Sequence, residues 1–525
     1  MSEVNKSLSI AQPHPEGVDG LGKAGLALSI VGLLVLLVAF LNIELPSTPT
    51  FLTFSICAIL IGTSVYAWRL YMNKPAGIKN NNVFLRSFTA RGMWGWIAGV
   101  VLTSFYVLLY WFPEYLGLVE GGNTGLVKLF DPLSMFFKGQ PASEWFVYGA
   151  LYTVAILSMG FKFILKYRHN AYQIIRTSSV MFWQLGIAFM LPEILQSLNY
   201  PYNDFKNMWP LNYYFADGWN IDGMIASGGF GLFMILFGVA MIFIISPILT
   251  FYFGKRWYCS WVCGCGGLAE TAGDPWRQNS DKSVKAWKVE RWLIHSVLVF
   301  VIIMTIAVLF TYLSPDPGKY WITRTIMAGI ITLILGSVAG LLLFWSKLKN
   351  EIESKVRYLA VGVATVVVVL TWMSVQSGSQ HVFFVDSYKL REAYGFYIGA
   401  LFAGVAGVGF YPIMGSRVWC RFGCPMAAIL GLQQKFFSRF RITTNGGQCI
   451  SCGNCSTYCE MGIDVRAYAQ KGQNIVRASC VGCGICSAVC PRGVLKLENG
   501  PVQNRVSDDP IIIGNEGVRL NEHVV

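Results

Sequence analysis

Long apolar stretches alternate with short polar connections along most of the chain. Each apolar stretch is close to the roughly 20 residues that a helix needs to cross the hydrocarbon core of a bilayer. The stretches lie near residues 24–42, 51–70, 93–112, 145–161, 178–196, 229–252, 292–312, 322–345, 358–376 and 395–413. This pattern predicts a mainly α fold, in which about ten spans form a polytopic transmembrane helical bundle.

The polar connections fall into two sets that alternate along the chain. Lys and Arg are concentrated in connections 69–92, 162–177, 254–291 and 346–358, and are sparse in 43–50, 113–144, 197–228, 313–324 and 377–394. Because basic connections usually stay in the cytoplasm, we expect the first set there. An even number of spans then places both termini in the cytoplasm, and we expect a multi-pass protein of the bacterial inner membrane.

The composition agrees with a lipid bilayer as the main environment. Hydrophobic residues make up 54% of the 525 residues and charged residues only 13%, which is typical of membrane proteins. The net charge of +13 follows from the basic connections, so we expect no nucleic-acid partner. The first 20 residues are polar and contain no cleavable apolar segment, so no signal peptide is expected.

Two cysteine runs near the C-terminal end share one spacing. They are Cys449, Cys452, Cys455 and Cys459, and then Cys480, Cys483, Cys486 and Cys490, the last followed by Pro491. The C-x2-C-x2-C-x3-C run is typical of ferredoxins with two 4Fe-4S clusters, in which the fourth cysteine of each run binds the other cluster. We therefore expect cluster I on Cys449, Cys452, Cys455 and Cys490, and cluster II on Cys480, Cys483, Cys486 and Cys459.

The alternatives for these eight cysteines are structural zinc and disulfides. Zinc sites use four ligands, usually as two CxxC pairs, and do not account for eight cysteines in two matched runs. All cysteines except Cys57 fall on the predicted cytoplasmic side, where thiols stay reduced. Glu460 stands where a proline often follows the fourth cysteine, and we interpret it as a change in the turn.

A second pair of cysteine motifs reveals an internal repeat. The sequence Gly254-Lys-Arg-Trp-Tyr-Cys259-Ser-Trp-Val-Cys263 aligns with Gly415-Ser-Arg-Val-Trp-Cys420-Arg-Phe-Gly-Cys424. Both follow the end of an apolar stretch, and Phe-Tyr precedes both. We interpret them as an internal duplication whose two copies face the same side. Cys265 is an additional thiol in the first copy, and Gly264 stands where the second copy has Pro425.

The repeat supplies four thiols that can act together. On a helix, Cys-x3-Cys places two sulfur atoms one turn apart on one face, so Cys259, Cys263, Cys420 and Cys424 could bind one soft metal or iron–sulfur centre or form reversible disulfides. Buried structural cysteines are the alternative. Basic residues beside both motifs favour thiolates and hence a redox or metal role.

These motifs resemble a known family. Polytopic membrane proteins of the NosR, NapH and CcoG type combine Cys-x3-Cys-Pro elements at cytoplasmic helix ends with a C-terminal double-cluster ferredoxin, and this chain is similar to them over roughly residues 90–500. The resemblance implies electron transfer between the membrane or its quinone pool and iron–sulfur clusters. The S/T-G-A-T flavin-attachment sequence of NosR-like members is missing, and the membrane part is longer than in the NapH and CcoG types.

The predicted domain organisation follows these motifs. It consists of a flexible cytoplasmic tail (1–23), membrane helices with the first repeat (24–253), a cytoplasmic CxxxC loop (254–291), membrane helices with the second repeat (292–413), a cytoplasmic CxxxCP segment (414–440), a small α+β ferredoxin-like domain with two clusters (441–500) and an extended tail (501–525).

The functional hypothesis is a membrane-bound electron-transfer protein. Electrons would pass between the membrane or a quinone and the two 4Fe-4S clusters, through the CxxxC thiols, to a redox partner protein. The alternatives are a factor that reduces or assembles copper or iron for a respiratory enzyme, and a redox-sensing regulator. The aromatic residues of connection 201–220 are interpreted as an interfacial belt, with a docking surface or a lid over a quinone as alternatives, and Asp274 as a turn residue.

Overall fold

The structure is a computed structural model, and it describes residues 18–72, 92–313, 322–500, 512–513 and 518–519. Most of the predicted tails 1–23 and 501–525, and most of connection 69–92, therefore lie outside the described residues. The first helix begins at Gly20, earlier than the predicted tail boundary, because Asp19 caps it by accepting a hydrogen bond from the Gly22 N–H at 2.9 Å.

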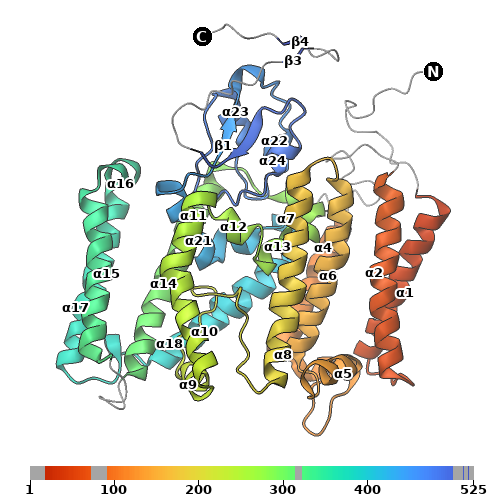
Figure 1. Ribbon diagram of the computed structural model, residues 1–525, viewed down its shortest axis with the longest axis horizontal. Helices are drawn as coiled ribbons and strands as arrows, with labels where there is room; N and C mark the ends of the chain where they lie inside the picture. Colours follow the sequence, from red (N-terminus) through yellow and green to blue (C-terminus); the bar gives the residue numbers. More distant parts are fainter. Residues whose placement is uncertain (1–17, 73–91, 314–321, 501–511, 514–517, 520–525) are drawn as a thin grey trace.

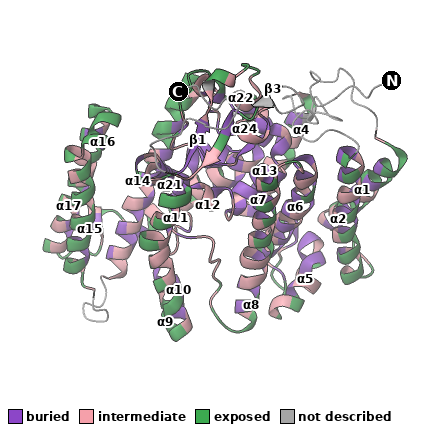
Figure 2. Cartoon of the chain, turned by 45° about the horizontal axis from the view of Figure 1, so that its top comes forward, coloured by how far each residue is buried: buried purple, intermediate pink, exposed green. Residues whose placement is uncertain are grey.

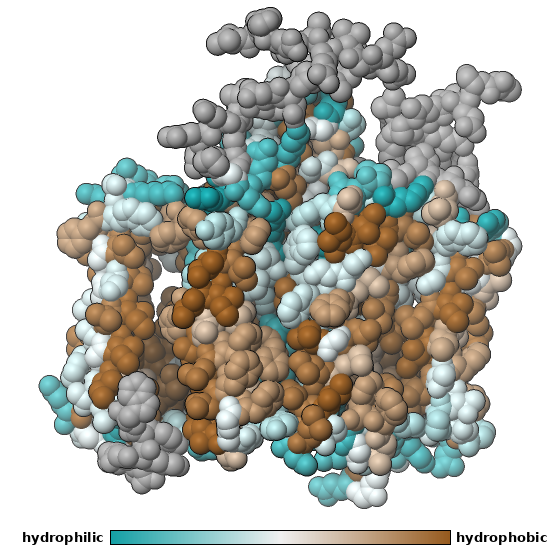
Figure 3. Space-filling view, viewed as in Figure 1, coloured by the Kyte–Doolittle hydropathy of each residue, from teal (hydrophilic) through white to brown (hydrophobic). Residues whose placement is uncertain are grey.

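Eight helices in the described residues are long and apolar enough to cross a membrane. They are Gly20–Phe40 (α1), Thr48–Met72 (α2), Glu144–Lys166 (α6), Ala171–Ser197 (α7, η4 and α8), Gly229–Phe253 (α10, η5 and α11), Val284–Tyr312 (α14), Arg324–Phe344 (α15) and Ser354–Gln376 (α17). They stand side by side in Figure 1, and Figure 3 shows a brown apolar band across them with polar residues above and below. The predicted polytopic helical bundle is thereby confirmed.

The two other predicted spans form helices whose apolar parts are shorter than those of the eight. The stretch 93–112 is α4 (Met93–Trp111), whose apolar part is shorter than that of the eight. The stretch 395–413 belongs to a helix that runs without a break from Ser387 to Gly409 through α18, η8 and α19, with a π-helical middle. Its first two turns carry charged residues, so its apolar part is too short to count as a long span.

One connection on the side opposite the ferredoxin domain re-enters the bundle. Two short helices lie on that side, α5 (Gly125–Lys138) and α9 (Gly218–Ala226), and the chain between α8 and α9 rises between the long helices (Figure 1). Met208 is 6% exposed and shares a core with Cys259, and the Trp209 indole donates to Thr305 of α14 at 2.9 Å. The predicted interfacial belt is therefore wrong for Trp209, whereas Trp219 is exposed.

The C-terminal domain is small and mixed, as predicted. Strand β1 (Arg441–Thr444) pairs antiparallel with β2 (Leu495–Glu498), with Arg441 opposite Glu498. Three short helices complete the domain: α22 (Asn454–Thr457), α23 (Val465–Gln470) and α24 (Ile485–Ala488). A second strand pair, β3 (Ile512–Ile513) and β4 (Val518–Arg519), follows it.

The two repeat copies lie where the helices meet this domain. The first copy forms α12 (Arg256–Cys259), α13 (Gly264–Thr271) and η6 (Asp274–Asn279), and the second forms α20 (Tyr411–Met414), η9 (Trp419–Gly423) and α21 (Pro425–Phe436). Each copy turns at a glycine with positive φ, Gly254 at +68° and Gly415 at +96°, where other residues would be strained. Figure 2 shows buried residues concentrated around α12, α13 and the base of the ferredoxin domain.

Candidate iron–sulfur and thiol site

The eight ferredoxin cysteines line two separate cavities. One cavity is lined by Cys449, Cys452, Cys455 and Cys490, and the other by Cys459, Cys480, Cys483 and Cys486. The structure thus gathers the same two sets of four that the sequence predicts for clusters I and II, including the exchange of the fourth cysteine between the runs.

The spacing of the sulfur atoms suits a cluster better than a single ion. Among the described residues, the only group of three or more potential ligands whose ligand atoms all lie within 4.8 Å of one another is Glu270, Glu460 and Cys483. No three cysteines of either cavity are that close. Four thiolates around one zinc ion, bound at about 2.3 Å each, would be closer than this limit, so the wider cavities favour an iron–sulfur cube.

The two cavities differ in exposure. Cys452 is exposed, and the other cysteines of the cluster I cavity are half-buried. In the cluster II cavity, Cys480 and Cys486 are buried and share one core with Cys259 and Cys420 of the repeats. Cluster I would therefore face solvent, and cluster II would face the membrane helices.

The membrane helices hold the cluster II loop through its backbone. Four consecutive carbonyl groups, those of residues 480–483, each accept a hydrogen bond from a side chain of the helical part. Gln434 donates to Cys480, Ser260 to Val481, Tyr172 to Gly482 and Gln173 to Cys483, at 2.7 to 2.9 Å. Gly484 has φ +76°, and a Cβ atom there would lie 2.9 Å from the Tyr172 ring. Glycine thus permits both the loop conformation and the close approach.

The four repeat thiols come together, although not on continuous helices as the sequence predicted. Cys259 ends α12 and Cys263 caps α13, and Cys420 lies in η9 and Cys424 caps α21. Each second cysteine thus stands at a helix N-terminus, where Cys424 Sγ accepts from the Ala427 N–H at 3.4 Å. The four side chains are only 6 to 8% exposed and share one core. We call these four cysteines the thiol site.

Burial sets the protonation of most of these thiols. It raises the pKa of Cys259 to about 12 and raises the pKa values of Cys420 and Cys424 as well. Cys263 differs, because a hydrogen bond with Cys265 lowers its pKa. A bound cation would supply the charge that keeps such buried sulfurs deprotonated.

Cys265 and the re-entrant connection complete the surroundings of Cys263. Lys206, the only lysine of that connection, is mostly buried, and its ammonium group favours the thiolate form of Cys263. Asp204 Oδ2 lies 3.6 Å from the ammonium, and the Tyr258 hydroxyl donates to the Lys206 carbonyl at 2.7 Å. A segment from the opposite face of the bundle therefore contacts the thiol site directly.

A buried network of charges joins the thiol site to cluster II. Arg417 Nη1 lies 3.6 Å from Cys420 Sγ and donates to the Cys259 carbonyl at 3.2 Å. The same guanidinium pairs with Glu270, and its Nε lies 3.0 Å from Glu460. Because Glu460 directly follows Cys459, Arg417 connects the two centres through one side chain.

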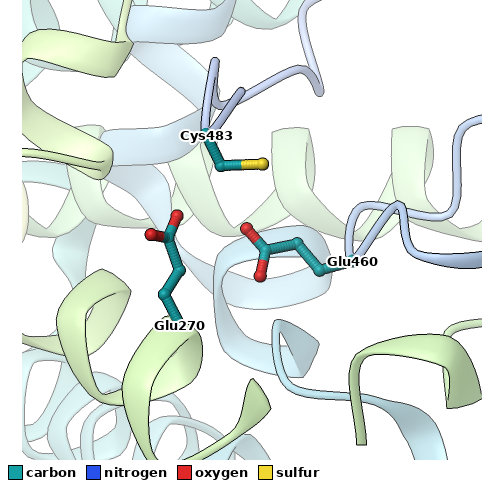
Figure 4. Close-up of side chains that lie close together, drawn as sticks. All are labelled: Glu270, Glu460 and Cys483. Atoms are coloured by element: carbon teal, nitrogen blue, oxygen red, sulfur yellow. The ribbon is translucent and has the colours of Figure 1, made fainter. Parts of the chain in front are cut away.

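Figure 4 shows the carboxylates of Glu270 and Glu460 lying close to each other and to Cys483. Three arginines neutralise this pair: Arg417 contacts both, Arg176 pairs with Glu270, and Arg277 Nη1 lies 3.0 Å from Glu460. Although burial raises it, the charges of Arg277 and Arg417 bring the pKa of Glu460 below its usual value. The group is thus a closed ion-pair network and leaves no negative charge for a metal ion.

Sequence reasoning missed the role of two acids in this network. The sequence indicates a turn variant at Glu460, but its side chain is completely buried between arginines. The sequence indicates a turn residue at Asp274, but it forms buried ion pairs with Lys166 at 2.5 Å and with Arg277 at 3.2 Å. The signal available in the sequence was the combination of acids and arginines around the cysteine motifs.

Comparisons with known families support iron–sulfur binding by the C-terminal domain and by the two repeat copies. A family model described as a 4Fe-4S dicluster domain matches residues 448–495. Another, described as a 4Fe-4S binding domain, matches residues 232–285 and again residues 396–443. No curated protein and no solved structure matches the chain.

These findings define the class of the protein. The chain is an iron–sulfur protein with membrane-spanning helices and a C-terminal 4Fe-4S ferredoxin region. Both copies of the predicted duplication lie within matches to one and the same 4Fe-4S family. The similarity to the NosR, NapH and CcoG type remains a prediction.

Proposed function

We propose that the protein transfers electrons between the membrane and a soluble redox partner. The observation that carries the proposal is the arrangement of the cysteines, since the solvent-facing cluster I set, the more buried cluster II set and the thiol site follow one another toward the membrane helices. In this arrangement Cys449, Cys452, Cys455 and Cys490 bind cluster I, and Cys480, Cys483, Cys486 and Cys459 bind cluster II. The clusters supply the redox chemistry, and the protein positions them.

We place a third centre at the thiol site, bound by Cys259, Cys263, Cys420 and Cys424. Support comes from the burial of all four thiols in one core and from the match of both repeat copies to a 4Fe-4S family. Arg417 contacts Cys420 of the thiol site and Glu460, which follows the cluster II ligand Cys459. Its positive charge would therefore stabilise negative charge on both centres. The described basic connections 162–177, 254–291 and 346–358 lie at the ferredoxin end of the helices (Figure 1), which favours an orientation with this end in the cytoplasm.

A cavity beside both centres suits a quinone. Its volume is about 790 Å³, within the range of ligand pockets. Aromatic residues supply much of its wall, namely Tyr172, Trp183, Phe253, Trp257 and Trp261. Trp261 lies between Cys259 and Cys263 in the chain, and Gly484, next to Cys483, also lines the cavity. A quinone bound there would lie beside the thiol site and cluster II.

Redox-titrated EPR with iron and copper analysis of the purified full chain tests the proposal. We expect two 4Fe-4S signals, a further signal from the thiol site, and reduction of the clusters by a quinol. Stoichiometric copper in place of iron at the thiol site would instead support the metal-handling function. Clusters that neither a quinol nor a low-potential soluble donor reduces would contradict electron transfer.

The assignment of cluster I is tested by Cys452→Ala. Removal of this ligand should lower the iron content by about four atoms per chain, since one 4Fe-4S cluster is lost, and should destabilise the ferredoxin domain. Cys57→Ala, in α2 and far from the cavities, is the control. A variant that keeps its full iron content would refute the assignment.

The quinone cavity is tested by Trp183→Leu. Loss of the aromatic wall should slow cluster reduction by quinol up to roughly tenfold, the usual worth of one aromatic contact, with iron content unchanged. Phe182→Leu is the matched control, because Phe182 is the neighbouring residue, is 62% exposed and does not line the cavity. Equal rates in both variants would place the quinone elsewhere.

A further inference from the structure

The hairpin of α15 and α17 packs against α14 through one cluster, which includes Phe310, Met327 and Val367, and is separated from the bundle elsewhere. Figure 3 shows a gap between this hairpin and the neighbouring helices at the height of the apolar band. The cleft there has a volume of about 630 Å³ and is lined by Ile303 of α14, by Leu359, Val363 and Val367 of α17, and by further apolar residues. No charged residue lines it. In a membrane, such a cleft is filled by hydrocarbon.

A second cavity lies on the same two helices at their ferredoxin end. Its volume is about 610 Å³, and its walls include His295 of α14 and Val356 of α17. His295 lies about two helical turns from the cleft residue Ile303, and Val356 lies about one turn from the cleft residue Leu359. An elongated molecule with a polar end could therefore occupy the cavity with that end and the cleft with its apolar part.

The charges around this cavity do not balance. Six cations line it, Lys255, Lys288, Arg291, Arg421, Lys435 and Arg477, against three carboxylates, Glu290, Glu351 and Glu353. Arg421 pairs with Glu290 at 2.7 Å and Lys435 with Glu351 at 2.9 Å. The remaining four cations face only Glu353, so the cavity is selective for an anion.

Two of these cations are held in place by a tryptophan. The guanidinium groups of Arg291 and Arg477 lie 5.0 and 5.1 Å from the centre of the Trp287 ring. Trp292, one turn further along α14, also lines the cavity and is 59% exposed. Tryptophan and arginine side chains gather at the level of lipid headgroups, so this cavity has the depth and the composition of a headgroup site.

Lys255 adds a buried charge at the wall of the cavity. Its side chain is 1% exposed, and its ammonium group donates one long hydrogen bond, 3.5 Å, to the Ala427 carbonyl. In the part of the chain that the structure describes, no carboxylate lies within 4.0 Å of it. The charge of Lys255 also acts on the Cys259 thiol, so an anion in the cavity would share this buried cation with the thiol site.

We propose that the cavity and the cleft together bind one anionic glycerophospholipid. Its phosphate would lie among Lys288, Arg291 and Arg477, and its acyl chains would extend along the cleft between α14 and α17. Basic pockets between membrane helices on the cytoplasmic side are typical sites for anionic headgroups. The charge distinguishes this ligand, because a quinone has no phosphate and a zwitterionic lipid carries a cation. The site does not depend on the proposed electron transfer.

Native mass spectrometry of the full chain tests the headgroup, with phosphatidylglycerol and phosphatidylcholine as probes. We expect one phosphatidylglycerol to stay bound and phosphatidylcholine to be lost. Lys288→Gln combined with Arg291→Gln should weaken the binding about thirtyfold, since each basic residue near an anionic headgroup contributes about a fivefold factor. Lys285→Gln, exposed on the same helix and outside the cavity, should change nothing. Equal retention of both lipids, or equal binding by the double variant, would overturn the proposal.

A second variant tests the cleft without touching the charges. Gly362 lines the cleft, and nothing lies within 4 Å of a Cβ atom placed there, so Gly362→Leu should fold and fill the space. We expect at least tenfold weaker retention of phosphatidylglycerol. Gly336→Leu is the control, because Gly336 is equally open on α15 but does not line the cleft. If Gly362→Leu displaces a bound quinone and leaves the phospholipid bound, the cleft holds the quinone and the proposal is wrong.

Discussion

Cys263→Ser is expected to leave clusters I and II in place and to abolish electron transfer between a quinol and these clusters. Cys263 lies outside both ferredoxin cavities, so the ferredoxin ligands are unaffected. Serine also caps helices well, so α13 should still begin at Gly264. We expect a loss of about a hundredfold or more in the rate, because even partners of metal ligands typically contribute 10- to 100-fold.

The measurement compares the rate of cluster reduction by quinol with the reduction by dithionite, which reaches cluster I directly. In Cys263→Ser only the first rate should fall, and the thiol-site signal should disappear. Cys57→Ser serves as the control and should leave both rates unchanged, since Cys57 lies in α2 and lines neither ferredoxin cavity. If quinol still reduces the clusters of Cys263→Ser at the normal rate, the four thiols serve only packing.

Much of the fold could be predicted because membrane helices and cluster motifs are local signals. A span depends on consecutive apolar residues, and eight of ten predicted stretches became long apolar helices. The grouping of the eight ferredoxin cysteines followed from spacing alone, and the cavities show the same two groups. The two exceptions are 93–112, whose apolar helix is shorter than the other eight, and 395–413, which lies in a helix whose first turns are charged.

The parts that could not be predicted depend on contacts between distant segments. Connection 201–220 is aromatic, which is typical of an interface, and only its tertiary contacts show that Met208 lies beside the thiol site. The CxxxC motifs were expected on continuous helices, but Cys263 and Cys424 each cap a new helix. The spacing of two cysteines four residues apart cannot distinguish one continuous helix from a junction between two helices, because both arrangements fit that spacing.

The charge network was hidden for the same reason. Glu270 and Arg417 are 147 residues apart, and Arg277 and Glu460 are far apart as well. In the sequence, each of these residues resembles an ordinary polar residue of a loop. These residues form ion pairs only when the repeats and the ferredoxin domain pack together and exclude water. An unpaired charge in that buried position would be strongly destabilising.

Glu460→Gln is expected to destabilise the junction between the ferredoxin domain and the membrane helices. Its two carboxylate oxygens lie 3.0 Å from Arg277 and 3.0 Å from Arg417, and all three side chains are completely buried. Glutamine keeps the shape but removes the negative charge, so two arginines remain buried with too little compensation. Breaking a buried ion pair in this way costs roughly 3–5 kcal/mol.

The urea concentration at which the 4Fe-4S absorbance is lost reports this effect. Glu460→Gln should lower the midpoint strongly, whereas Glu351→Gln, the control, should hardly change it. Glu351 pairs with Lys435 at 2.9 Å, but the two side chains are 40% and 31% exposed, and such surface pairs contribute about 1 kcal/mol or less. The substitution should also raise the reduction potential of cluster II, because a negative charge next to Cys459 is removed. An unchanged midpoint together with an unchanged potential would show that the network neither holds the ferredoxin domain in place nor tunes its inner cluster.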